Sequence, residues 1–166
     1  MTTLTIVFDD SVMIKDGYKR AKFDSSDSNN PLEAKRVALG HQSARAIQWN
    51  TNSGDIEYSD GSPNGSIGSS EIDQYLAIFE AQYVAETKTK FLSQDASEIA
   101  REKRNELIQE TDWWANSDLT MTAGQTAYRQ ALRDLPDHAT DWNPALSWDD
   151  STWVGSLTGV TWPTKP

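Results

Sequence analysis

The sequence contains no cysteine and few basic residues, and each shortage excludes a class of chemistry. Without cysteine the chain forms no disulfide bond, has no thiol nucleophile and offers no thiolate ligand to a metal. Lys and Arg number 15 against 25 Asp and Glu, which gives a formal charge of -10. Nucleic-acid binders rely on clustered Lys and Arg, so we expect no nucleic-acid partner. No apolar run of about 18 residues is present, so we expect no insertion into a membrane.

The sequence also lacks the patterns that direct secretion or carry catalysis. Its first ten residues, MTTLTIVFDD, have neither a basic start nor a long apolar stretch, so we expect no signal peptide. His41 and His138 lie far apart, and no catalytic triad order, glycine-rich phosphate loop or metal-binding helix motif is present. Asp134, Asp137, His138 and Asp141 do not match a calcium loop, and we interpret them as acidic surface. We therefore expect no enzyme activity, no catalytic residue, no metal site and no cofactor.

Residues 1–68 have the alternation and turn residues of a small β-rich module. Strands are predicted over residues 4–8, 11–14 and 18–23, and Asp16-Gly17 is typical of a tight turn between the last two. A hairpin is predicted from residues 44–50 (ARAIQWN) and 55–58 (DIEY). Four apolar residues would pair across it: Ile47, Trp49, Ile56 and Tyr58. The polar, turn-rich residues 24–31 and 60–70 are predicted loops, whereas residues 32–41 give no clear prediction.

Residues 69–98 are predicted to form a helical connector, whose start is weakly indicated by Ser70 with Asp73 three residues later. No Pro or Gly interrupts residues 71–117, so one helix of about 35–40 residues fits, as do two helices that break near residues 93–97. Four apolar residues share one helical stripe: Ile72, Leu76, Phe79 and Tyr83. The stripe either packs on its own module or forms a coiled coil with another copy, which would make the protein a homo-oligomer. The sequence favours neither arrangement.

The C-terminal part carries the motif that says most about function. Residues 104–136 read RNELIQETDWWANSDLTMTAGQTAYRQALRDLP, and the chain ends in WPTKP. This string resembles the phage tail assembly chaperone-like domain, which occurs at the C-terminus of tail-fibre assembly proteins and of some virion structural proteins, including those of cyanobacterial phages. The resemblance covers residues 99–136 and the last five residues. The N-terminal module is more weakly similar to the β module that precedes this domain in related proteins.

The resemblance implies a non-enzymatic phage tail protein, structural or accessory, that is attached to the tail fibre or baseplate or assists their assembly. Its partners would be other phage tail proteins. It would be made in the host cytoplasm and reside in the tail of the virion. The alternative is a receptor- or glycan-binding module at a tail-fibre tip, which would bind a host surface glycan.

Physical roles for the motif can be argued from residue types. A helix is predicted over residues 123–135, capped by Thr122 with Gln125 and ended by Pro136. In a helical hairpin, Trp113 would form a small core with one face of this helix, which Trp162 would close. That face comprises Tyr128, Ala131, Leu132 and Leu135. Two arginines one turn apart would pair with acidic residues near the loop. These are Arg129 and Arg133, with Asp112 or Asp118.

Tryptophan is abundant, with seven in 166 residues and six of them after residue 112. Three of them, Trp142, Trp148 and Trp153, lie in residues 137–161, which are long compared with the family pattern. Aromatic residues among Asp and Asn fit internal packing, a protein interface or a sugar platform, and all three interpretations stay open. The candidate partner-binding residues are Trp113, Trp114, Arg129, Arg133, Trp142, Trp148, Trp153 and Trp162.

The sequence therefore predicts an α+β protein. A small β-rich N-terminal module (1–68) leads through a long connecting helix (69–98) to a tail assembly chaperone-like region (99–166). That last region is expected to be a helical hairpin with an insertion at 137–161 and an extended tail rich in Trp and Pro.

Overall fold

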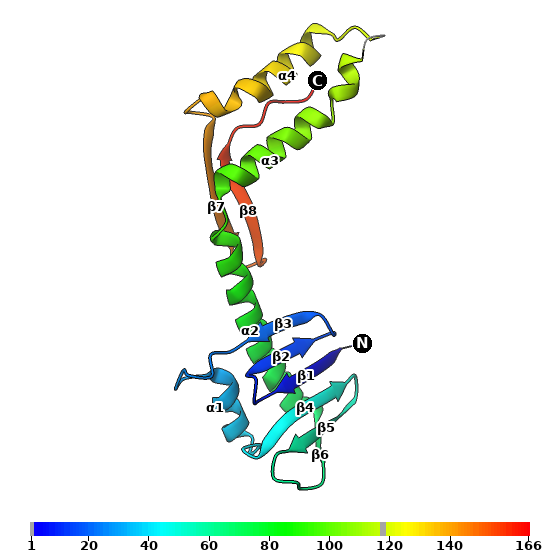
Figure 1. Cartoon of the computed structure of the whole chain (residues 1–166), viewed down its shortest axis with the longest axis vertical. Helices are drawn as coiled ribbons and strands as arrows, with labels where there is room; N and C mark the ends of the chain where they lie inside the picture. Colours follow the sequence, from blue (N-terminus) through cyan, green and yellow to red (C-terminus); the bar gives the residue numbers. More distant parts are fainter. Residues whose placement is uncertain (1, 117–118) are drawn as a thin grey trace. The chain divides into compact units, whose positions relative to one another are not determined.

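The computed structural model describes residues 2–116 and 119–166. The chain divides into two compact units, residues 1–87 and 88–166. Helices and antiparallel strands occur along the chain (Figure 1), which confirms the α+β class. Within the described residues, no helix is both long and apolar enough to cross a membrane.

A six-stranded antiparallel sheet forms the centre of the first unit. Its order is β3-β2-β1-β4-β5-β6, and its strands are β1 (Thr3–Val7), β2 (Val12–Lys15), β3 (Lys19–Lys22), β4 (Ala44–Asn50), β5 (Ser53–Tyr58) and β6 (Gly65–Ile67). Five of these strands were predicted, and Asp16 and Gly17 have the positive φ expected of their turn. The prediction of a loop over residues 60–70 was wrong at β6. That strand is only three residues long, and Ile67 is buried opposite Gly54.

The β4–β5 hairpin has the predicted strands and part of the predicted pairing. Ile47 lies opposite Ile56, as expected. Trp49 lies opposite Gly54 instead of Tyr58, and its ring occupies the space that a Cβ atom on this glycine would need, at 2.9 Å. The glycine therefore makes room for the indole on the buried face of the sheet.

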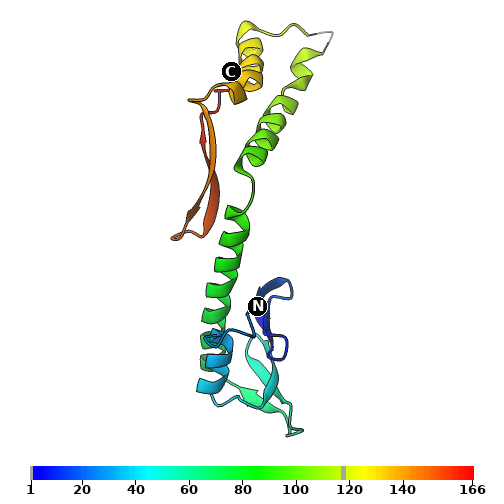
Figure 2. The same ribbon diagram turned by 60° about the vertical axis from the view of Figure 1, so that its left-hand side comes forward.

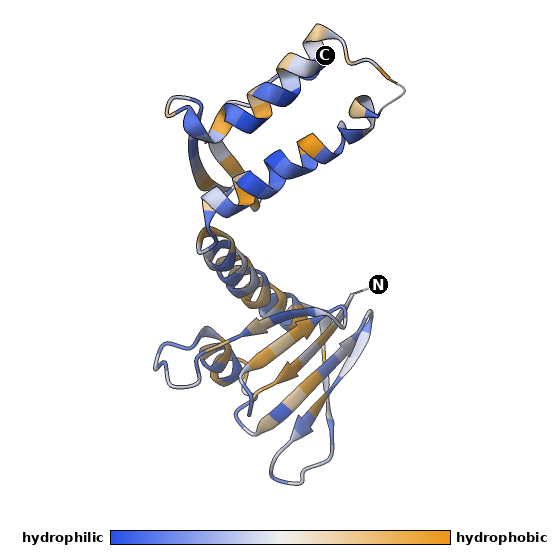
Figure 3. Ribbon diagram, turned by 45° about the horizontal axis from the view of Figure 1, so that its top comes forward, coloured by the Kyte–Doolittle hydropathy of each residue, from blue (hydrophilic) through white to orange (hydrophobic). Residues whose placement is uncertain are grey.

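Helix α1 (Pro31–Ala38) and most of helix α2 (Ser69–Leu92) complete the first unit. Helix α1 forms where the sequence gave no clear prediction, because the Asn30 side chain caps its first turn by accepting from the backbone N–H groups of Leu32 and Glu33. Apolar residues are concentrated on the central strands (Figure 3). Their side chains form the core with those of helix α2. The largest fully buried side chain is that of Tyr75, on α2.

Helix α2 starts one residue before the predicted cap. The N–H of Gly68 donates to the Glu71 carboxylate at 3.1 Å, and the Gly68 carbonyl accepts from the N–H of Ile72 at 3.1 Å. The prediction that Ser70 and Asp73 cap this helix was therefore wrong. Glu71, in the first turn, caps the helix instead, because its carboxylate accepts the hydrogen bond from the Gly68 N–H.

The α2 stripe packs on the sheet of its own unit. Ile72 and Phe79 are almost completely buried, while Leu76 and Tyr83 pack against the same core. The rings of Phe79 and Tyr83 stack with centroids 5.5 Å apart. A second helix could reach Ile72 or Phe79 only by displacing the sheet. Self-association through this stripe stays a prediction, and the packed arrangement accounts for the spacing without it.

Two helices, and not one, cover residues 69–109. Helix α2 ends at Leu92, and α3 (Ala96–Gln109) begins after Asp95, whose side chain accepts from the N–H groups of Ser97 and Glu98 at 2.7 and 3.2 Å. The single continuous helix is therefore excluded, and the predicted break near residues 93–97 is confirmed. The boundary between the two units, after Thr87, lies within α2.

The second unit pairs helix α3 with α4 (Ala123–Asp134) and adds a β hairpin (Figure 2). Short 3-10 helices follow α3 and α4: η1 (Asp112–Ala115) and η2 (Leu135–Asp137). The predicted capping box is present, because Thr122 accepts from the Gln125 N–H and the Gln125 side chain accepts from the Thr122 N–H. The predicted helix over 123–135 is thus confirmed, apart from one residue at its end.

The insertion at 137–161 folds as an antiparallel hairpin of β7 (Trp142–Asp149) and β8 (Val154–Val160). Alternate residues of β7 are half-buried, and the hairpin packs on α3. Its turn is held by Asp149, which accepts from the Ser151 N–H and hydroxyl and from the Thr152 hydroxyl. These hydrogen bonds, led by the one from the Ser151 hydroxyl, lower the pKa of Asp149 to about 2. Trp153 closes the turn with a φ of 58°.

Candidate partner-binding surfaces

A small aromatic core joins helices α3 and α4. Trp114, Tyr128 and Leu132 are buried together, with Trp162 packed against them. The rings of Trp114 and Tyr128 lie 6.1 Å apart. Of the predicted core, Tyr128, Leu132 and the closing Trp162 are therefore present.

The prediction that Trp113 belongs to this core was wrong. Trp114 is the buried indole, whereas Trp113 is 60% exposed and lies edge-on against it at 6.0 Å. Both residues sit in the 3-10 helix η1, where adjacent side chains point in different directions. Residue type alone could not decide which of the two faces inward.

Arg129 is a buried cation that ties α4 to the end of α3. One guanidinium nitrogen donates to the Ile108 carbonyl at 3.1 Å and to the Thr111 hydroxyl at 2.7 Å. The other donates to Asp112 at 2.8 Å, as predicted. A positive charge beside the last carbonyls of a helix is favourable, because those groups carry the negative end of the helix dipole. Arg129 is therefore a structural residue, with little surface left for a partner.

Arg133, one turn further along α4, has an exposed side chain. Asp118, its other predicted partner, lies outside the described residues.

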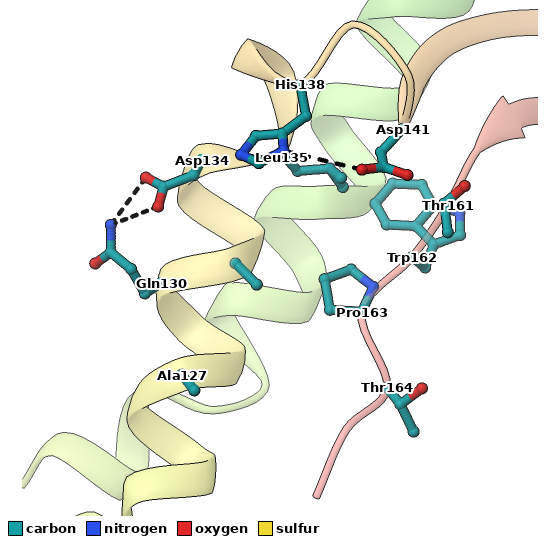
Figure 4. A pocket seen from close by; sticks show the side chains of 11 residues that line it. Ala127, Gln130, Asp134, Leu135, His138, Asp141, Thr161, Trp162, Pro163 and Thr164 are labelled. Atoms are coloured by element: carbon teal, nitrogen blue, oxygen red, sulfur yellow. Dashed lines mark hydrogen bonds and ion pairs between the residues drawn. The ribbon is translucent and has the colours of Figure 1, made fainter.

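The C-terminal tail lies along this helical hairpin (Figure 4). Its Trp162 meets Trp142 of β7 edge to face, with ring centroids 6.4 Å apart. Further on, the Lys165 ammonium lies 3.3 Å from the Glu110 carboxylate and 5.7 Å from the Trp114 ring. The tail is thus pinned at both ends by aromatic and charged contacts.

The other two tryptophans of the β hairpin differ in exposure. Trp148 is half-buried against Phe91 of α2, with ring centroids 6.2 Å apart. Gly155 lies opposite Trp148, and a Cβ atom there would come within 2.5 Å of the Phe91 ring. Trp153, at the turn, is 54% exposed. Sequence reasoning missed Phe91 and Gly155, although the spacing of two between Trp142, Pro144, Leu146 and Trp148 is typical of a half-buried strand.

A groove of about 630 Å³ runs between helix α4 and the tail (Figure 4). Its apolar lining comprises Ala127, Ala131, Leu135, Trp162 and Pro163. The prediction that Ala131 lies on the inner face of α4 was wrong. Arg129 occupies the inner face, and Ala131 is exposed to the groove.

Acidic side chains border the same groove. Asp134 accepts from the Gln130 amide with both oxygens, at 2.8 and 3.0 Å, and Asp141 lies 3.9 Å from His138. Lys and Arg are absent from its lining. Among the described residues, no group of three or more His, Cys, Asp or Glu is arranged to hold a metal ion.

The first unit contains a buried polar pair that the sequence did not indicate. The Tyr75 hydroxyl lies 3.0 Å from Nδ1 of His41, and Nε2 of His41 lies 3.4 Å from the Glu71 carboxylate. Burial raises the pKa of Tyr75, so its hydroxyl stays protonated. The pair joins helix α2 to the loop before β4 and has a structural role.

Comparison with known proteins bears on the second unit. Residues 97–166 match the family model described as phage tail assembly chaperone protein. No curated protein and no solved structure matches the chain. The matched range covers α3, α4, the β7–β8 hairpin and the tail.

This part of the chain is therefore phage tail assembly chaperone-like, which confirms the family predicted from the sequence. The matched range includes residues 137–161, which were expected to lie outside the resemblance. The description of the family indicates a role in phage tail assembly and interaction with other phage tail proteins.

Proposed function

We propose that this protein assists assembly of the tail fibre or baseplate of a bacteriophage, or stays attached to one of them, by binding other tail proteins. The observation that carries the proposal is the family match over residues 97–166. In this proposal residues 99–166 bind the tail protein, residues 69–98 form the connector and residues 1–68 form a β-rich module. The chemistry required is protein binding, not catalysis.

Exposed apolar residues near the α3–α4 loop support a protein-binding role. Trp113 is 60% exposed and Leu119 is 50% exposed. Large exposed aromatic residues are common anchors of protein interfaces, because they bury much apolar area at a small cost in side-chain entropy. Trp114, by contrast, is buried and holds the helical hairpin together. The tryptophan pair thus combines a structural residue with one that is free for a partner.

Co-expression of the full chain with each fibre and baseplate protein of its phage tests the proposal. We expect co-elution with one of them in size-exclusion chromatography. Trp113→Ala should weaken that complex, whereas Val37→Ala, at a residue of the first unit that is 49% exposed, should leave it unchanged. Failure of every fibre and baseplate protein to co-elute would contradict the proposal.

The competing function is glycan binding through the tryptophans of the β hairpin. Trp142 packs on Trp162 and Trp148 packs on Phe91, so Trp153 is the one of the three that is largely exposed. A sugar platform needs an open aromatic face, and the packed rings offer less of it. Binding of the purified protein to host surface polysaccharide, lost in Trp153→Ala, would favour this function over tail assembly.

A further inference from the structure

We propose that the groove between helix α4 and the C-terminal tail binds an extended segment of a partner protein in which lysine or arginine alternates with apolar residues. The inference deepens the proposed function and rests on it, since the partner is taken to be a tail protein. It specifies the binding site on this chain and the chemistry of the segment that fits it.

The floor of the groove is apolar and open. Ala127 and Ala131 lie one helical turn apart on α4 and are both exposed, so their small side chains leave room above the helix. Trp162 and Pro163 form the facing wall, and Leu135 closes one end (Figure 4). Apolar side chains of a bound segment would find contacts on both sides.

The wall formed by the tail suits an extended partner. Residues 161–166 have no helical or strand structure, and two of them are prolines, which keep the chain extended. Thr161 and Thr164 border the groove with exposed hydroxyl-bearing side chains. A segment that lies alongside an extended chain can use its own backbone for hydrogen bonds, as in other modes of peptide recognition.

The charge of the groove selects a basic segment. Asp134 and Asp141 border it, and between Arg133 and Lys165 the sequence has five Asp and no Lys or Arg. Gln130 holds the Asp134 carboxylate in place, and each carboxylate has capacity to accept further hydrogen bonds. An ammonium or guanidinium group would meet these acceptors with no lysine or arginine in the lining to compete; His138 also lies there, 3.9 Å from Asp141. An acidic segment would be repelled.

Peptide binding to the purified full-length protein tests the inference. The probe is a fluorescein-labelled peptide, Gly-Lys-Leu-Lys-Leu-Lys-Gly, followed by fluorescence anisotropy. Two control peptides replace every lysine by glutamate or every leucine by serine. We expect saturable binding of the first peptide that weakens as salt is raised, and at least tenfold weaker binding of both controls. Equal binding of all three peptides, or no binding of the first, would overturn the inference.

Substitutions in the groove show where the peptide binds. Ala131→Leu fills the floor and should weaken binding more than tenfold, while Ala145→Leu, at an exposed residue of β7, should leave it unchanged. Asp134→Asn together with Asp141→Asn should weaken binding about fivefold and reduce its salt dependence, because partly exposed ion pairs are each weak. Glu98→Gln together with Glu102→Gln, both on the exposed surface of α3, is the matched charge control. Equal effects of groove and control variants would overturn the inference.

The two proposals fail in different ways. If the Ala131→Leu protein still co-elutes with its tail protein as wild type does, the groove is not the site and the inference fails, although tail binding stands. If no tail protein co-elutes with the wild-type chain, the proposed function fails, whatever the peptides show.

Discussion

Arg129 offers the sharpest test of how the tail assembly chaperone-like region is held together. Replacing it with methionine keeps most of the aliphatic side chain and removes the guanidinium group. Two of its acceptors, the half-buried Ile108 carbonyl and the buried Thr111 hydroxyl, then lose a charged donor. We expect this variant to unfold the second unit more easily, with the packing of the first unit unchanged.

The size of the effect follows from the exposure of each partner. Thr111 is fully buried, and an unpaired buried acceptor costs about 1–3 kcal/mol. The Ile108 carbonyl keeps the Thr111 hydroxyl as a donor at 2.8 Å, so its loss is smaller. The pair with Asp112 adds about 0–1 kcal/mol, because that carboxylate is 61% exposed. Loss of the cation at the end of α3 adds about 0.3–1 kcal/mol. The free energy of unfolding should therefore fall by about 1–5 kcal/mol.

Urea denaturation followed by tryptophan fluorescence measures this loss. Six of the seven tryptophans lie after residue 112, so the fluorescence reports mainly on the second unit. The exposed Arg133→Met is the matched control and should change stability by less than about 0.5 kcal/mol. A value for Arg129→Met within about 0.5 kcal/mol of wild type would refute the role given to the buried guanidinium.

Four further substitutions test the packing of the second unit. In the same urea experiment, Trp114→Ala should lower the free energy of unfolding by about 3–5 kcal/mol, because this indole is buried. Trp113→Ala should lower it by less than about 1 kcal/mol, because that indole is exposed. The reverse order would contradict the assignment of the buried ring. Gly155→Ala places a methyl group within 2.5 Å of the Phe91 ring and should cost about 1–3 kcal/mol, so a neutral result would refute this contact. Thr122→Ala removes a helix cap and should lower stability by about 1 kcal/mol, with reduced helical circular dichroism; unchanged stability would show that the capping box is dispensable.

Local patterns were enough to predict most of the elements. The strands of the first unit follow from alternating apolar residues and from turn residues such as Asp16 and Gly17, whose positive φ is a local property. The capping box of α4 follows from the three-residue spacing of Thr122 and Gln125. The turn and the cap are encoded within a few residues, which is why the sequence indicates them. The ion pair between Arg129 and Asp112, 17 residues apart, was predicted from residue type and from the expected helical hairpin.

Features that depend on contacts between residues far apart in the chain could not be predicted from local sequence patterns. The choice between Trp113 and Trp114 depends on the direction of a 3-10 turn, and burial of Ile67 in a three-residue strand depends on its pairing with β5. Both are decided by tertiary packing, which overrides local preference.

For the candidate site, too, residue types could be predicted from the sequence, but their burial could not. The sequence marked the aromatic and charged residues of the C-terminal motif as candidates for partner binding, but it could not separate those that build the fold from those on the surface. Arg129 and Trp114 are buried, while Trp113 and Trp153 are exposed. The groove was missed because its floor is made of alanines such as Ala131, which carry no recognisable chemistry.

The central claim is that this protein acts in phage tail assembly. The most direct measurement is electron microscopy of particles made by a phage that lacks its gene, with and without the protein supplied from a plasmid. We predict particles with defective fibres or baseplates and low infectivity, both restored by the wild-type protein. Complete, infectious tails in the absence of the protein would contradict the account.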